Sequence, residues 1–177
     1  LDNMGEDVEL PYLRSLFNMA LAYVVNDSVE KAIELYRSCQ AMNVIMYKDT
    51  SEKVYKNNMV EIYTKLPACY EKMAEEIDTA HSELWYYRAI DTRDTLIELL
   101  KETNVDGDVN KTYQTAVQDR NNAGVFYHLE MIPSAQDYLD KSNELLMMLY
   151  NSEYKTEVAE DVIQNYTLKA AFYQDAG

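Results

Sequence analysis

The sequence predicts an all-α protein, built as an α-solenoid of about eight antiparallel helices that stack as hairpins. Two observations lead to this fold class. The chain has only four glycines and three prolines, too few for the many turns of a β-sandwich or barrel. In addition, an asparagine precedes a tyrosine by five residues in three helical stretches, each followed by a turn and a second amphipathic stretch. The three pairs are Asn18 and Tyr23, Asn58 and Tyr63, and Asn122 and Tyr127.

The clearest hairpin lies near the start of the chain. Residues 12–25 place apolar side chains at three- and four-residue steps, which is the pattern of one helix face. The triplet 26–28 predicts a turn, in which Ser28 can cap the next helix. Residues 29–41 then repeat the apolar pattern and form the second helix of the hairpin.

The next segment predicts a second hairpin with a very short turn. Thr50 or Ser51 can cap a helix that runs to about Leu66, and Pro67 then begins another, since proline is accepted in a first helical turn. Residues 78–103 leave two alternatives open. Either one long helix precedes a short one, or a degenerate third hairpin lies here; the second interpretation is favoured.

The last third of the chain predicts three helices. Residues 104–110 form the one firm loop, because they combine glycine, aspartate and asparagine. A helix follows over about 109–130 and ends before Pro133, and another covers about 133–150. After the triplet 151–153, a final helix runs to about Tyr173.

Residues 18–39 resemble a tetratricopeptide repeat (TPR) along their whole length. Ala20 stands three residues before Tyr23, and Ala32, Tyr36 and Cys39 follow at the family's spacing. This spacing has a physical cause, because close-packed antiparallel helices need small residues where they touch. The resemblance implies a right-handed TPR-like solenoid.

Two further segments are similar to the same repeat. Residues 57–73 look like a second copy, in which Val60 replaces the small residue, and residues 121–142 look like a third, with Gly124 at that position. The resemblance implies a single domain, 1–177. Its clear repeats lie at about 12–41, 51–80 and 117–150, with a degenerate region at 81–110 and a C-terminal capping helix at 152–173.

The resemblance also implies a peptide-binding groove. In the family, the first helix of each pair lines the concave face, and the asparagine before the tyrosine often bonds to the backbone of a bound peptide. The implied groove residues are Arg14, Asn18, Asn57, Asn58, Glu61, Gln118, Asn121 and Asn122. No lysine or arginine stands near Asn58 at the offset that Arg14 has from Asn18, which argues against a receptor for C-terminal carboxylates.

The function that follows is a non-enzymatic protein- or peptide-binding module, without cofactor or metal. It would be the sensing or scaffolding segment of a larger signalling or regulatory protein. The alternative is a helical-bundle enzyme or metal-binding protein with an interior site around His81 and His128. His81 lies three residues after Asp78, but His128 has no carboxylate at that offset, so paired metal ligands are not predicted. Cys39 and Cys69 have no metal-binding spacing and sit among packing residues.

The charge balance limits the kinds of partner that we expect. The chain carries 16 basic and 31 acidic residues, a net charge of −15, which repels phosphate backbones and argues against nucleic acid. A basic protein or peptide fits better. No apolar run approaches the roughly 20 residues of a membrane span, and we expect a cytoplasmic protein that does not contact membranes. The start at Leu1 without methionine indicates an excised or processed chain. The sequence does not set an oligomeric state.

Overall fold

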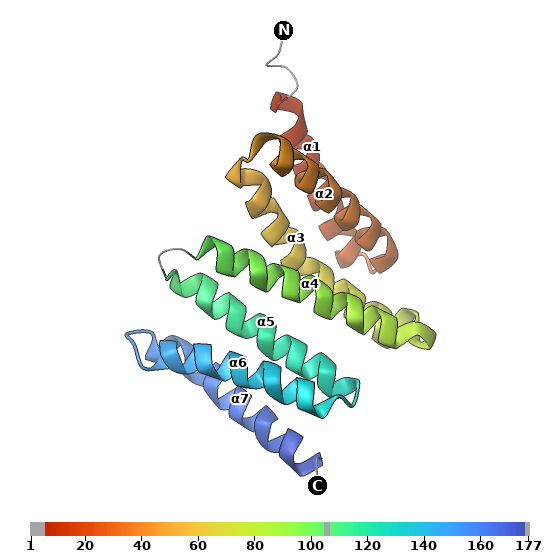
Figure 1. Ribbon diagram of the computed structural model, residues 1–177. Helices are drawn as coiled ribbons and strands as arrows, with labels where there is room; N and C mark the ends of the chain where they lie inside the picture. Colours follow the sequence, from red (N-terminus) through yellow and green to blue (C-terminus); the bar gives the residue numbers. More distant parts are fainter. Residues whose placement is uncertain (1–5, 105–106, 176–177) are drawn as a thin grey trace. The chain divides into compact units, whose positions relative to one another are not determined.

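The computed structural model describes residues 6–104 and 107–175, and this part of the chain is helical with no strand (Figure 1). The predicted all-α class is confirmed. The α-helices are α1 (Glu6–Val25), α2 (Val29–Thr50), α3 (Lys53–Lys72), α4 (Ser82–Thr103), α5 (Val109–His128), α6 (Ile132–Tyr150) and α7 (Lys155–Asp175). These are seven α-helices in the described residues, where the sequence predicts about eight.

The chain divides into two compact units, Leu1–Thr92 and Arg93–Gly177. The predicted solenoid and the single domain concern the chain as a whole, and both stay predictions.

The first predicted hairpin is present in unit 1, where α1 and α2 lie side by side (Figure 1). Ala20 and Ala32 are fully buried in its core, together with Tyr36 and Cys39. Phe17 meets Tyr36 edge to face, with ring centroids 5.6 Å apart. The small residues therefore lie in the packed interior of the hairpin, where close helix approach requires them.

The turn of this hairpin also matches the prediction, with one difference. Asp27 adopts a φ of 59°, and the Ser28 N–H donates to the Tyr23 carbonyl at 2.8 Å, which closes α1. Ser28 is the N-cap of α2, but its side chain makes no capping hydrogen bond.

Helix α2 is nine residues longer than the sequence predicts, because it continues beyond Ala41 to Thr50. The extra turns bury Asn43 and pack Met42, Met46 and Tyr47 against the core of unit 1. Ser51 does not cap the next helix. It ends α2 in the left-handed conformation, with φ 59°, and its N–H donates to the Tyr47 carbonyl.

The prediction that Pro67 begins a new helix is wrong, because α3 runs through it from Lys53 to Lys72. Leu66, Pro67 and Tyr70 are all buried, so continuing the helix keeps both turns packed in the core. The chain turns instead at a short π-helical segment, Met73–Ile77, and a 3₁₀ turn, Thr79–His81. The prediction of a degenerate hairpin within 78–103 is also wrong, since α4 is one continuous helix after this turn.

Unit 2 contains the C-terminal part of α4 and, at the predicted places, the helices α5, α6 and α7, with α6 packed against both α5 and α7 (Figure 1). Asp108 caps α5, where its side chain accepts from the N–H of Asn110 at 2.9 Å. Arg120 on α5 pairs with Asp161 on α7 at 2.7 Å, and both side chains are largely buried. Of the predicted loop, residues 105 and 106 lie outside the described residues.

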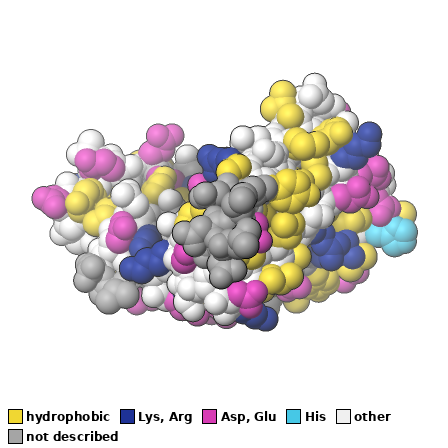
Figure 2. All heavy atoms as spheres, turned by 90° about the horizontal axis from the view of Figure 1, so that it is seen from above, with side chains coloured by type: hydrophobic (Ala, Val, Ile, Leu, Met, Phe, Trp, Pro, Cys, Tyr) yellow, Lys and Arg dark blue, Asp and Glu magenta, His cyan; other side chains and the backbone are white. Residues whose placement is uncertain are grey.

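Acidic side chains lie at several places on the face that Figure 2 shows, with lysine and arginine side chains between them. The acidic side chains behind the net charge of −15 are therefore not gathered in one patch on this face. Among the described residues, no helix combines the length and the apolar character that crossing a bilayer requires.

Candidate functional site

Helices α1, α2 and α3 of unit 1 enclose a cavity of about 200 Å³. Its floor is apolar, and three polar side chains stand at its edge. The lining residues are Leu10, Leu13, Arg14, Phe17, Cys39, Val54, Asn58, Glu61 and Ile62. A concave apolar surface with a few polar groups is the usual form of a ligand site.

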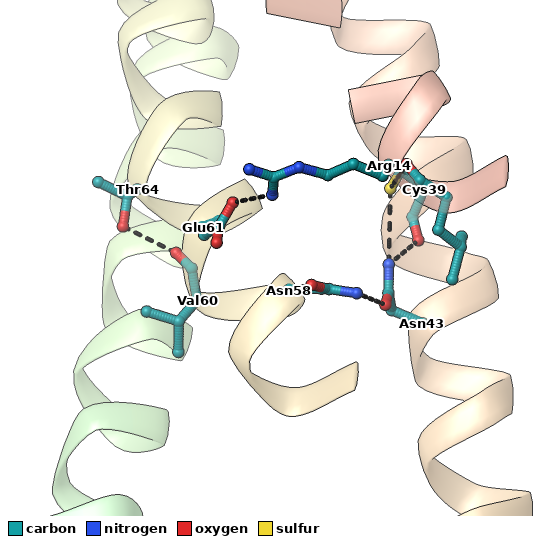
Figure 3. Close-up of polar contacts among 8 residues, drawn as sticks. Arg14, Cys39, Asn43, Asn58, Val60, Glu61 and Thr64 are labelled. Carbon is teal, nitrogen blue, oxygen red and sulfur yellow. Dashed lines mark hydrogen bonds and ion pairs between the residues drawn. The ribbon is translucent and has the colours of Figure 1, made fainter. Parts of the chain in front are cut away.

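An ion pair joins α1 to α3 at this cavity. The Arg14 guanidinium donates to Glu61 Oε2 at 2.7 Å (Figure 3), and it lies 5.4 Å from the centroid of the Phe17 ring. The side chains are 58% and 48% exposed. Ion pairs this exposed contribute about 0–1 kcal/mol, so a ligand can separate the two groups at little cost.

A relay of amides orients the third polar residue, Asn58. The buried Asn43 donates from Nδ2 to the Cys39 carbonyl at 2.8 Å, and its Oδ1 accepts from Asn58 Nδ2 at 3.0 Å (Figure 3). One N–H of Asn58 Nδ2 is thus used inside the protein, which fixes the direction of the amide. Its Oδ1 is the end left to accept a hydrogen bond from a ligand.

The thiol of Cys39 contributes an uncharged wall. Its Sγ donates to the Leu13 carbonyl at 3.5 Å. Burial raises the pKa of this thiol, and the hydrogen bond from Asn43 offsets only part of that effect. Burial likewise raises the pKa of Cys69 to about 11. Both thiols therefore stay protonated at neutral pH, a state that does not favour nucleophilic chemistry.

The structure brings three of the predicted groove residues of unit 1 together. Arg14, Asn58 and Glu61 line the same cavity. Asn18 is exposed one turn after Arg14, and Asn57 is exposed beside Asn58; neither is among the residues that line the cavity.

The predicted groove residues of unit 2 have a different setting. Gln118 and Asn121 are half-buried, whereas Asn122 is fully buried. Its Nδ2 donates to Asp94 Oδ1 at 2.9 Å, so this donor is already used within the unit. Peptide binding by these three residues stays a prediction.

A buried carboxyl group, Asp119, lies one turn before Asn122 on α5. It is 3% exposed, and burial raises its pKa to about 6, with smaller opposing contributions from Lys101 and Lys141. Its neighbour Asp94 also accepts from the Tyr138 hydroxyl, at 2.9 and 3.0 Å.

The two histidines of the alternative enzyme hypothesis are both exposed. His81 Nδ1 lies 2.9 Å from Asp78 Oδ1, and the other oxygen of Asp78 accepts from Trp85 Nε1. Within the described residues, no group of three or more histidine, cysteine, aspartate or glutamate side chains is arranged to hold a metal ion. Neither histidine therefore marks an interior site.

Sequence reasoning missed the apolar floor of the cavity and the amide that orients Asn58. Phe17 and Ile62 share helix faces with Arg14 and Asn58 at three- and four-residue steps, so the helical period could have placed them together. Asn43 was missed because the predicted helix ends at Ala41. Comparison of the chain with protein-family models, with curated proteins and with solved structures found no match.

Proposed function

We propose that this chain is a non-enzymatic module that binds a short peptide segment in the cavity of unit 1. The observation that carries the proposal is that Arg14, Asn58 and Glu61 line one apolar cavity. Within the proposal the chain is a TPR-like sensing or scaffolding segment of a larger regulatory protein, and it acts in the cytoplasm.

The size of the cavity favours a peptide side chain over a cofactor. Pockets for drug-sized ligands measure about 300–1,000 Å³, whereas this cavity measures about 200 Å³. It therefore has room for one or two apolar side chains, while the rest of the ligand stays outside.

The polar groups at the edge suit a peptide main chain. A main chain offers N–H donors and C=O acceptors whatever its side chains are. Asn58 Oδ1 and the Glu61 carboxylate can accept hydrogen bonds from main-chain N–H groups, and the Arg14 guanidinium can donate to a main-chain carbonyl. In many peptide complexes, hydrogen bonds to the main chain supply affinity and pockets for side chains supply specificity.

A leucine scan of short peptides tests the proposal. In these peptides of glycine and serine, one leucine occupies each position in turn, and a leucine-free peptide is the control. We expect at least one leucine peptide to shift the methyl NMR signals of Leu13, Val54 and Ile62, while the control leaves them in place. If no leucine peptide shifts these signals, the cavity is not a peptide site.

Two tryptophan variants localise the binding. Val54→Trp should fill the cavity and abolish the response, because Val54 lines it. Lys53→Trp is the matched control, since Lys53 is exposed at the start of the same helix. Circular dichroism shows whether each variant is folded. Equal binding by both folded variants would place the peptide elsewhere.

A further inference from the structure

We infer that the occupant of the cavity is the first residue of a peptide, with an apolar side chain and a free α-ammonium group. This inference rests on the proposed function and narrows it to one kind of ligand. The apolar side chain fills the cavity, and the ammonium group binds between Asn58 Oδ1 and the Glu61 carboxylate.

The amide relay sets the direction of the Asn58 amide, so that its Oδ1 is an acceptor that a ligand can use. Asn43 is 0% exposed, and its Nδ2 is committed to the Cys39 carbonyl, so its Oδ1 needs a donor. Asn58 Nδ2 supplies that donor at 3.0 Å. Reversing the Asn58 amide would put two oxygens against each other and leave the buried Asn43 Oδ1 without its donor, which is unfavourable. The cavity therefore meets its ligand with an acceptor at this position.

Glu61 adds a negative charge beside that acceptor. It lies three residues after Asn58 on α3, so the two side chains share a helix face. Its Oε2 already holds the cationic guanidinium of Arg14 at 2.7 Å. A cation is thus the group that this position attracts, and an ammonium group can bind to the carboxylate beside Arg14 or in its place.

The apolar floor begins next to these two acceptors. Val54, Asn58 and Ile62 follow at four-residue steps on α3, and all three line the cavity. In an N-terminal residue the ammonium group and the side chain are carried by the same α-carbon. A ligand of this kind can reach the acceptors and the floor at once, whereas a lysine ammonium lies at the end of a long apolar chain.

The charge of the whole chain favours the same ligand. A net charge of −15 attracts a positively charged peptide end, mainly by raising the association rate. A neutral, acetylated end gains nothing from this field.

Three probes test the inference by isothermal titration calorimetry. They are Leu-Gly-Ser-Gly with a free amine, the same peptide N-acetylated, and Gly-Ser-Leu-Gly. We expect acetylation, or moving the leucine, to weaken binding about tenfold, the loss of roughly one charge-assisted hydrogen bond.

The outcomes separate the inference from the proposed function. If the acetylated or the internal-leucine peptide binds as tightly as the free-amine peptide, peptide binding stands and the N-terminal inference falls. If none of the three binds, both fall. Free leucine is a fourth probe and should bind more weakly than the tetrapeptide; equal affinity would make the ligand an amino acid and overturn the assignment to a peptide.

Charge-removing variants give a second test. Glu61→Gln should remove most of the preference for the free amine over the acetylated peptide. Glu34→Gln, an equal change at an exposed position of α2 that does not line the cavity, should keep it. A preference that survives Glu61→Gln would contradict the role of the carboxylate.

Arg14→Gln should act differently. It should weaken the free-amine and the acetylated peptide to a similar extent, because the guanidinium can donate to a main-chain carbonyl that both peptides carry. The preference for the free amine should therefore remain. A preference lost in Arg14→Gln as well as in Glu61→Gln would contradict the assignment of that preference to the carboxylate.

Discussion

The buried Asn43 is the residue on which the orientation of the candidate site depends. Its Oδ1 has a donor in Asn58 and it lies in a fully buried position. Asn58→Ala should therefore leave a buried oxygen unpaired and lower the free energy of unfolding by about 1–3 kcal/mol. Asn57→Ala, the same change at the exposed neighbour, should stay within about 0.5 kcal/mol. Urea denaturation followed by circular dichroism measures both, and equal stabilities would mean that the relay does not stabilise unit 1.

Asp119 is the residue that most clearly links stability to pH. The pKa of this carboxyl group is raised from 3.8 to about 6, mainly by burial; Lys101 and Lys141 lower it, and Asp94 and Asp137 contribute to raising it. The folded state therefore binds the proton more tightly than the unfolded state does, and the ionised form is the costly one. This cost is fully present above pH about 6 and disappears as the pH falls to about 4.

Asp119→Asn should remove that cost. At pH about 7.5 the variant should be more stable than the parent by up to about 3 kcal/mol, since one pKa unit corresponds to about 1.4 kcal/mol. The difference should shrink as the pH is lowered to about 4. Asp49→Asn, at an exposed position of α2, is the control. A gain in stability that is the same at both pH values would contradict the pKa shift as its cause.

Part of the candidate site could be predicted from the sequence. Arg14, Asn58 and Glu61 are predicted by the resemblance to a helical repeat, which implies groove residues on the first helix of each pair. The direction of the Asn58 amide could not be predicted, because it depends on Asn43, which lies on another helix and beyond the predicted end of that helix. The burial of Asn122 could not be predicted either, because its partner Asp94 is 28 residues away.

At the scale of the elements, the first hairpin depends on two alanines. Ala20 and Ala32 are both 0% exposed in the core of unit 1. Ala20→Trp or Ala32→Trp should lower stability by about 1–3 kcal/mol or more, because the enlarged side chain forces the helices apart. Ala22→Trp and Ala41→Trp are matched controls at exposed positions of the same two helices. Thermal unfolding compares the four, and unchanged stability in the first two would rule out close packing at these positions.

Helix positions were easier to predict than helix ends. Apolar periodicity located α1, α5 and α6 because each ends at a turn with local signals. Apolar periodicity did not predict the ends of α2 and α3. In both cases tertiary packing continues the helix beyond residues that only weakly favour a helix end. Buried Tyr70 on the far side of Pro67 supplies that packing, and proline alone does not show whether such a partner exists.

At the scale of the whole molecule, the acidic excess should weaken the fold by self-repulsion. With a net charge of −15, raising the ionic strength with sodium chloride to about 0.15 M shortens the Debye length to about 8 Å and screens this repulsion. The melting temperature should therefore be higher than at low salt. A melting temperature that falls on adding sodium chloride would mean that favourable exposed ion pairs, such as Lys141 with Asp137, outweigh the repulsion.

Trp85 is a fluorescence probe that belongs to one unit of the chain. It is the single tryptophan of the chain; its ring stacks on Tyr70 at 5.8 Å and its Nε1 donates to Asp78, and all three residues belong to unit 1. Selectively excited indole fluorescence therefore reports on the surroundings of unit 1 alone, while the circular dichroism of the helices reports on both units. Coinciding transitions would show that the units melt as one cooperative body, and separated transitions would assign one melting step to each half of the chain.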